Sequence, residues 1–214
     1  MAGTFILGET KVRPGSYFNI QKKGGNSSAS VMNGVTAVIF QADFGPLNTA
    51  VEMDASDGYE KIFGTGLTTD AIKEAIAGGA KTIIACRLGN GGTQGTISLE
   101  DVDGEDALTV TAKYPGDKDF TVTIREKLSD SALKECIFYA GTTEFEKVEF
   151  NAGEGEAKAL ADALAASKNF KAEVKAGSDS KVLAVVSQSP FTKGTNPQVT
   201  NGDYSNAFAQ VEPY

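Results

Sequence analysis

Hydrophobic runs in the first half of the chain predict a small sheet of mixed character. Residues 35–40 and 81–88 are almost continuously apolar, as strands buried on both faces usually are. Residues 49–53 form a candidate strand between them, and a helical pattern covers residues 68–77. Strand, connection, helix and strand in this order are typical of an α/β unit.

The expected helix carries signals at both of its ends. Thr68 or Thr69 is placed to cap the first turn, and the pair Gly78-Gly79 follows the last turn. Ile72 and Ile76 are one helical turn apart, so they share one apolar face. These signals predict a helix that begins near Thr69 and ends at Ala77.

From about residue 96 the pattern changes to alternation. Apolar and polar residues alternate over 108–113, 120–125 and 170–175, which is typical of antiparallel strands with one face in water. Residues 137–139 and 145–150 are further candidate strands. One helix is expected among them, from a stripe made of Ala157, Leu160, Ala161, Leu164 and Ala165.

The last part of the chain begins with an apolar run and ends with a helix signal. Residues 182–186 predict another fully apolar strand. Thr200 and Asp203 have the spacing of a capping box, in which each side chain bonds the other residue's backbone N–H. Tyr204 and Phe208 then occupy positions i and i+4 of the expected helix, which makes it amphipathic.

These changes of pattern divide the chain into four predicted segments. Residues 1–20 form an extended arm, and residues 21–95 form a first α/β part. Residues 96–180 form a β-rich domain with one helix, and residues 181–214 return to the first kind of structure. The glycine-rich stretch 89–95 is interpreted as a hinge between the two kinds of structure.

Composition excludes several classes of enzyme. The chain of 214 residues contains no histidine, which rules out Ser-His-Asp triads, Cys-His dyads and zinc or haem sites that use histidine. Its 20 basic and 28 acidic residues give a formal charge of −8, which argues against nucleic acid as a partner.

The sequence lacks targeting and membrane signals. Its first residues contain neither a basic region nor an apolar stretch of signal length, so we expect a protein made in the cytosol. Because its apolar runs are all shorter than a membrane span, we expect no insertion into a membrane. Cys86 and Cys136 are expected to be buried free thiols, with a reactive or paired thiol as the alternative.

Two glycine-rich stretches invite comparison with phosphate-binding loops. Residues 89–95 lack the third glycine of the dinucleotide motif, and a strand-like sequence follows them where that motif needs a helix. Residues 64–69 precede the expected helix, but Thr69 stands at the third glycine position. We favour a structural role for both stretches, and phosphate binding remains the alternative.

The acidic stretch 101–106 has a cation-binding and a structural interpretation. A calcium loop of the EF-hand type needs a glutamate at its twelfth position, where this chain has Ala112. A hairpin turn with Asp103-Gly104 at its tip is therefore the favoured interpretation. From its residues the sequence predicts no catalytic residue, no cofactor and no metal.

Six short segments, in order along the chain, resemble contractile tail sheath proteins of Gram-positive phages and defective prophages. They are residues 13–19 (RPGSYFN), 35–46 (VTAVIFQADFGP), 61–64 (KIFG), 80–92 (AKTIIACRLGNGG), 112–116 (AKYPG) and 199–204 (VTNGDY). Phe44 stands where the family usually has tryptophan. Asp117-Lys118-Asp119 replaces a stretch that resembles RGND in other members.

The resemblance implies an α+β fold class, with a mixed α/β sheath core and an inserted β-sandwich-like domain carrying one helix. It assigns residues 21–95 to the first part of the core, 96–180 to the insertion and 181–214 to the start of the main sheath domain. The family continues well beyond the length of this chain. The core is therefore expected to be incomplete here, as in a fragment or a short paralogue.

The resemblance also implies a function without catalysis. Sheath subunits polymerise helically around a tail tube and contract to drive it through a cell envelope. The implied partners are neighbouring sheath subunits, the tail tube protein, the baseplate and the tail terminator, and the implied location is a virion or a phage-tail-like particle. Extended arms link the subunits, and the candidate linking residues are Arg13, Pro14, Gly15, Tyr17, Phe18 and Ile20.

Two other functions stay open at this point. One is a nucleotide- or phosphate-binding α/β enzyme that uses residues 64–69 or 89–95. The other is a surface decoration or binding module built on the β-sandwich of residues 96–180.

Overall fold

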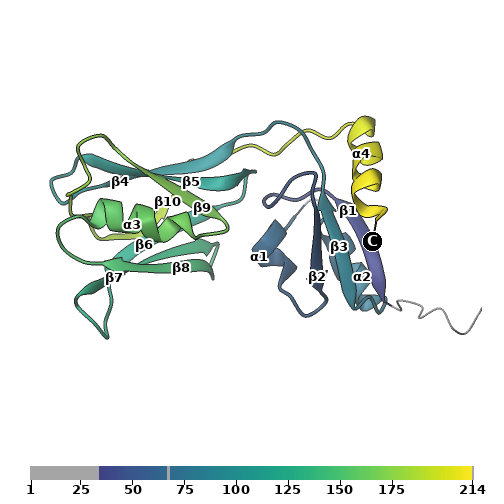
Figure 1. Ribbon diagram of the computed structural model, residues 1–214, viewed down its shortest axis with the longest axis horizontal. Helices are drawn as coiled ribbons and strands as arrows, with labels where there is room; N and C mark the ends of the chain where they lie inside the picture. The colour runs from purple at the N-terminus through teal and green to yellow at the C-terminus, as the bar shows by residue number, and fades with distance from the viewer. Residues whose placement is uncertain (1–33, 67, 214) are drawn as a thin grey trace, which may run out of the picture. The chain divides into compact units, whose positions relative to one another are not determined.

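The computed structural model describes residues 34–66 and 68–213 (Figure 1). Helices and several sheets are both present, so the expected α+β class is confirmed. The six candidate linking residues between Arg13 and Ile20 lie outside the described residues.

The first sheet has three strands in the order β1-β3-β2. Its strands are β1 (Val35–Phe40), β2 (Ala50–Asp54) and β3 (Thr82–Arg87). β1 pairs with β3 in parallel, and β2 pairs with β3 in antiparallel orientation. Burial on both faces is confirmed for β3, whose last five residues are all buried. It is wrong for β1, where only Val38 and Phe40 are buried, because β1 lies at the edge of the sheet.

Two helices accompany this sheet, α1 (Tyr59–Phe63) and α2 (Asp70–Ala77). In α2, Ile72 is fully buried in the same cluster as Ile76, which confirms the predicted apolar face. Thr69 stands at the N-cap position but makes no capping bond. Its hydroxyl instead donates a hydrogen bond to the carbonyl of Gly66, because Thr69 already has helical backbone angles.

A second group of strands forms two antiparallel sheets. One sheet has the order β4-β5-β9, and the other has the order β10-β6-β7-β8. The strands of the first are β4 (Gln94–Glu100), β5 (Asp106–Pro115) and β9 (Phe170–Val174). Those of the second are β6 (Phe120–Glu126), β7 (Leu133–Ala140), β8 (Thr143–Asn151) and β10 (Val186–Pro190). We call residues 94–190 the β-rich region.

The two antiparallel sheets share one core. Phe138 of β7 stacks on Phe170 of β9, with ring centroids 4.0 Å apart. The helix α3 (Glu156–Ala165) contacts β8 and β9 and buries Leu160 and Leu164 in this core. The alternating pattern of the sequence is thus confirmed as sheets with one packed face.

The strand expected over residues 182–186 is largely absent, because β10 begins only at Val186. Leu183 is fully buried, but Val185 is 62% exposed. Side chains also bind the backbone of Leu183: its N–H donates to Glu156 and its carbonyl accepts from Lys134. In this apolar run only Leu183 is fully buried, and side chains rather than a neighbouring strand bind its backbone. The run therefore does not form the expected strand.

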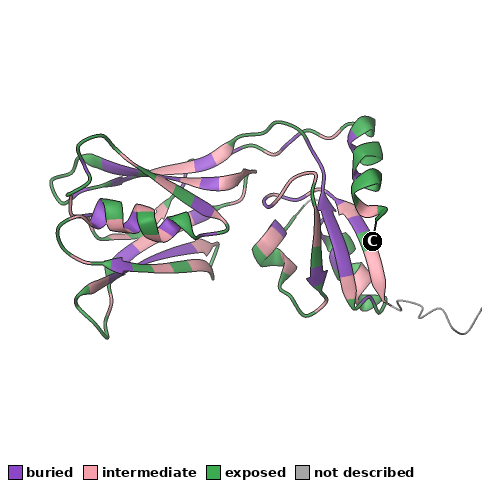
Figure 2. Cartoon of the chain, viewed as in Figure 1, coloured by how far each residue is buried: buried purple, intermediate pink, exposed green. Residues whose placement is uncertain are grey.

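The helix α4 (Asn201–Val211) begins with the predicted capping box between Thr200 and Asp203. Its packed residue is Ala207, which is buried against Cys86 and Leu88 at the end of β3. The predicted aromatic pair is exposed instead, Tyr204 by 40% and Phe208 by 62%. Figure 2 shows the outer surface of α4 as predominantly exposed. We call residues 34–88 together with α4 the sheet region.

Candidate functional site

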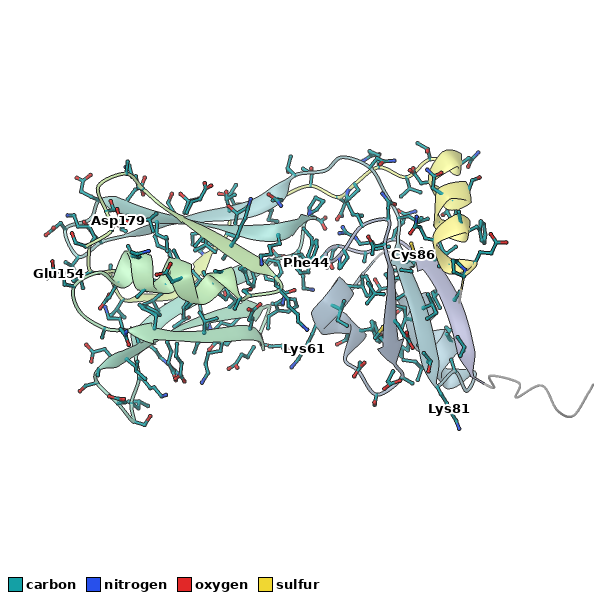
Figure 3. All side chains as sticks on the ribbon, in the orientation of Figure 1. Phe44, Lys61, Lys81, Cys86, Glu154 and Asp179 are labelled. Atoms are coloured by element: carbon teal, nitrogen blue, oxygen red, sulfur yellow. The ribbon has the colours of Figure 1, made fainter. Side chains whose placement is uncertain are left out.

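Phe44 connects the sheet region to the core of the β-rich region. It lies in the turn after β1 and is 1% exposed. Its ring makes edge-to-face contacts with Tyr114, Phe120 and Phe145, at centroid distances of 5.4, 5.1 and 5.7 Å. Figure 3 labels Phe44 near the ends of the strands of the β-rich region. The site contains no reacting group; its chemistry is apolar burial with aromatic geometry.

Arg87, the last residue of β3, fixes the turn that carries Phe44. Its guanidinium is completely buried and donates to three carbonyl oxygens, those of Ala42, Gly45 and Pro115. The three N···O distances are 3.0, 2.7 and 2.9 Å. Two of these carbonyls flank Phe44 and the third belongs to β5, so one side chain ties both regions together.

Burial lowers the pKa of Arg87 to about 10, while the nearby Asp43 and Asp117 oppose this shift. The guanidinium therefore keeps its charge at neutral pH. A buried charge needs compensation, and the three carbonyl dipoles supply it. This explains why the arginine tolerates a site from which water is excluded.

Asp43 forms a second connection beside Phe44. Its carboxylate accepts a hydrogen bond of 2.9 Å from the N–H of Thr65 and lies 3.6 Å from the amine of Lys118. Burial raises the pKa of Asp43, and the charge of Lys118 opposes the shift. At Gly64 an added Cβ would overlap the Asp43 carboxylate, and at Gly116 it would overlap the Asp43 carbonyl. Both positions thus require glycine, because Asp43 approaches their backbone too closely for a side chain.

The stretch expected to be a hinge is paired along its length with the chain returning from β10. Backbone bridges join Asn90 to Gln198, Thr93 to Thr195 and Thr96 to Thr192. An added Cβ on Gly92 would lie 2.6 Å from the carbonyl oxygen of Thr195. The glycines therefore permit two chain segments to approach closely, so the stretch interpreted as a hinge is a paired segment.

Asn90 extends this connection to α4. Its side-chain amide donates a hydrogen bond to the carboxylate of Asp203, which is 3% exposed. The other oxygen of Asp203 accepts from the N–H of Thr200 at 2.7 Å, and this bond lowers the pKa of Asp203. The capping box of α4 is thereby held against the end of β3.

The five resembling segments that lie within the described residues thus meet at one place. The turn at Phe44, Gly64, Arg87 and Gly116 are joined by the contacts above, and Asp203 is joined to them through Asn90. We call this the junction. Sequence reasoning did not select Arg87, although an arginine ending an apolar strand was an available signal.

Neither glycine-rich stretch has the form of a phosphate site. The N–H of Thr65, which such a site would need, already binds the carboxylate of Asp43. Residues 89–95 are paired with the returning chain and lead into β4 rather than a helix. The backbone N–H groups of Thr65, Asn90 and Thr93 thus already have acceptors within the chain.

The acidic stretch after β4 forms the expected hairpin turn. One oxygen of Asp101 accepts from the N–H groups of Asp103 and Glu105, at 2.9 and 3.0 Å. Its other oxygen lies 2.6 Å from the amine of Lys181, and this interaction lowers the pKa of Asp101. Within residues 34–66 and 68–213, no group of three or more acidic or cysteine side chains is arranged to hold a metal ion.

Cys86 and Cys136 are both free and buried, as predicted. Burial raises the pKa of each thiol, so neither is activated as a nucleophile. Among the described helices, none is long and apolar enough to cross a membrane.

Comparison with known protein families and relatives gives two kinds of result. No family model matches the chain. Among curated proteins, the uncharacterised protein YqbK of Bacillus subtilis is 25% identical over 150 residues, which cover 68% of this chain and 31% of YqbK.

Two solved structures share the fold. The sheath tail protein Lin1278 of Listeria innocua matches 85% of this chain and 38% of its own, with a TM-score of 0.59 and 24% identity. The sheath tail protein DSY3957 of Desulfitobacterium hafniense matches 94% of this chain and 43% of its own, with a TM-score of 0.60 and 20% identity. The chain has the fold of part of these sheath tail proteins, and it spans less than half the length of the relatives it matches.

Proposed function

We propose that the chain is a structural subunit of a contractile tail sheath, or a portion of one. It polymerises helically around a tail tube and contracts to drive the tube through a cell envelope. Its partners are neighbouring sheath subunits, the tail tube protein, the baseplate and the tail terminator. The protein is made in a bacterial cytoplasm, acts in a virion or phage-tail-like particle, and has no catalytic role.

The shared fold is the observation that carries this proposal. It extends over 85% and 94% of the chain in two comparisons with sheath tail proteins. The junction supports it further, because the fold brings together the five resembling segments that lie within the described residues. We propose the same four segments as above, with residues 96–180 as an insertion in the sheath core.

The outer edge of β1 is suited to accept a strand from another subunit. The carbonyls of Gly34 and Phe40 accept bonds from the β3 side, so in a parallel ladder the alternate residues Val35, Ala37 and Ile39 direct their backbone groups outward. In the described part of the chain, no strand pairs with this edge. Strand addition would satisfy these groups.

The same edge has a defined end. The N–H of Gln41 donates to the hydroxyl of Thr68, and the N–H of Thr68 donates to the carbonyl of Gln41. An added strand would therefore pair with Val35 to Ile39 and stop there. We propose that the arm of a neighbouring subunit supplies this strand, with the candidate residues between Arg13 and Ile20.

Electron microscopy tests the main proposal. The product of the gene that encodes this chain, purified with its tail tube protein, is expected to form striated tubes of two diameters. Deletion of residues 1–20 is expected to abolish the tubes while leaving the described region folded. Regular tubes from the deletion variant would disprove the role of the arm, and a product that never forms tubes would contradict the sheath proposal.

A proline tests the receiving edge separately. Ala37→Pro removes one outward N–H, which an edge strand tolerates, but it blocks the approach of a new strand. Ala37→Ser at the same position is the matched control. Tubes are expected from the serine variant and not from the proline variant, with unchanged circular dichroism in both. Equal assembly of the two variants would exclude β1 as the receiving edge.

A further inference from the structure

We propose that Phe44 and Arg87 form a latch that couples the sheet region and the β-rich region into one mechanical body. The latch is defined as these two side chains, the carbonyls of Ala42, Gly45 and Pro115, and the aromatic rings around Phe44. This inference goes beyond a role in assembly, because it concerns the single chain in solution.

The latch combines two contacts of different kind. Phe44 anchors the turn by burying an aromatic ring among Tyr114, Phe120 and Phe145. Arg87 holds the backbone on both sides of that ring and reaches across to Pro115. Loss of the ring would leave a cavity, and loss of the guanidinium would leave three buried carbonyls without donors.

Clefts next to the latch show that the coupling is concentrated there. One cleft of about 430 Å³ is lined by Lys61 from α1 and by Asp119 and Glu144 from the β-rich region. Another of about 560 Å³ is lined by Glu52 of β2 and by Lys168. Phe145 lines both clefts, and it also contacts Phe44. Beside the latch, therefore, open clefts rather than packed core separate the two regions.

Two further connections between the regions are described. One is the ion pair of Asp43 and Lys118. The other is the pair of chain segments with bridges between residues 90–96 and 192–198. Two-stranded pairings of this kind are weak by themselves. Without the latch they are expected to act as a flexible ribbon, and with it they are held at a fixed angle.

Residual dipolar couplings measured by NMR test the latch in the folded chain. In the unaltered protein, one alignment tensor is expected to fit the amides of both regions. In Phe44→Ala and Arg87→Met, each region is expected to keep its own chemical shifts but to need a separate tensor. Hydrogen exchange of the amides of Asn90, Thr93 and Thr96 is expected to accelerate ~10-fold or more, because the ribbon opens locally.

Matched variants separate the latch from general loss of packing. Phe150→Ala removes a buried ring from the core of the β-rich region away from Phe44, and Arg125→Met removes a partly exposed arginine. In both control variants, one alignment tensor is expected to fit the amides of the two regions. Phe44→Leu leaves a smaller cavity than Phe44→Ala. It replaces the alanine variant in the experiment if that variant does not fold.

Three results would overturn the proposal. They are two tensors in the unaltered protein, one tensor in folded latch variants, and an equal uncoupling by the control variants. None of these depends on polymerisation, so failure of the latch and failure of the sheath proposal are distinguishable.

Discussion

The β-rich region and the sheet region differ in whether the edges of their sheets are covered. In the β-rich region, α3 lies against β8 and β9, and backbone bridges join Thr96 of β4 to Thr192 and Asp101, just after β4, to Leu183. In the sheet region, the outer edge of β1 has no partner among the described residues, and Phe208 is exposed on α4. Covered edges prevent unwanted pairing, whereas an open edge invites it. Among the described residues, the outer edge of β1 is therefore the one that matches the proposed strand addition, whereas the edges of β8 and β9 are covered by α3.

The largest expected effect comes from the group that closes the β-rich region. Glu156 of α3 accepts bonds from Lys134 at 2.7 Å and from the N–H of Leu183 at 2.8 Å, and it is 1% exposed. Glu156→Ala leaves the buried amine of Lys134 without its partner, so we expect a loss of about 3–5 kcal/mol in the free energy of unfolding. Chemical denaturation followed by circular dichroism measures it.

The control for this variant lies on the same helix. Lys158 pairs with Asp162, and the two side chains are 60% and 67% exposed. Lys158→Ala is expected to change the free energy of unfolding by less than about 0.5 kcal/mol. A similar loss in the free energy of unfolding for the two variants would mean that the buried pair of Glu156 and Lys134 does not stabilise the β-rich region.

The paired segments between the two regions give the next largest effect. Gly91 and Gly92 both have positive φ, of 71° and 80°. At Gly91 an alanine meets no atom within 4 Å, so only the backbone cost of about 1–2 kcal/mol is expected. At Gly92 the added carbon also meets the carbonyl of Thr195, so Gly92→Ala is expected to cost more. Thermal unfolding of the two variants checks the order, and a greater loss at Gly91 would contradict the close approach.

Substitutions on α4 test which side of the helix is already occupied. Ala207 is 1% exposed against β3, so Ala207→Phe is expected to cost about 1–3 kcal/mol by overpacking. Phe208→Ala is expected to change the free energy of unfolding of the isolated chain by less than about 0.5 kcal/mol. If Phe208→Ala proved as costly as Ala207→Phe, the aromatic side of α4 would already be packed.

Acid is expected to weaken both regions through one carboxylate in each. The pKa of Asp101 is lowered first of all by its bond to Lys181, and that of Asp203 by the N–H of Thr200. A carboxyl whose folded pKa lies below its unfolded value of ~3.9 stabilises the protein above that value. The stabilisation is lost as the pH falls through the folded pKa.

Denaturation measured between neutral and strongly acidic pH checks this dependence. Asp101→Asn and Asp203→Asn are each expected to flatten the curve, since the asparagine does not titrate. Asp43 has the opposite effect on stability. Because burial raises its pKa, its ionised form destabilises the folded state and its protonation in acid relieves that cost. A steeper acid dependence in either asparagine variant would contradict the assignment.

Much of the local structure was predictable from the sequence. The alternation of Phe120, Val122 and Ile124 indicated β6, and the Thr200–Asp203 spacing indicated the start of α4. These signals depend on residues that are close together in the sequence, so they can be read without knowledge of the fold. The acidic turn at Asp101 and the buried free thiols were predictable for the same reason.

Two features that the sequence did not reveal have a common cause. Residues 182–186 were expected to be a strand, but Leu183 is the one residue among them that is fully buried, and the side chains of Glu156 and Lys134 bind its backbone. Residues 89–95 were interpreted as a hinge, and the sequence did not reveal their pairing with residues 192–198. In both cases the deciding partner lies far along the chain.

The sequence by itself determined the periodicity of the strands and helices, the turn residues and the resemblance of six ordered segments to sheath proteins. Only the tertiary structure decided that Arg87 binds carbonyls on both sides of Phe44, and that Ala207 rather than Phe208 packs against the sheet. Periodicity records which side of an element is apolar, because it depends on near neighbours. Which surface that side meets, and whether an edge is covered, depends on contacts between distant residues that no local pattern contains.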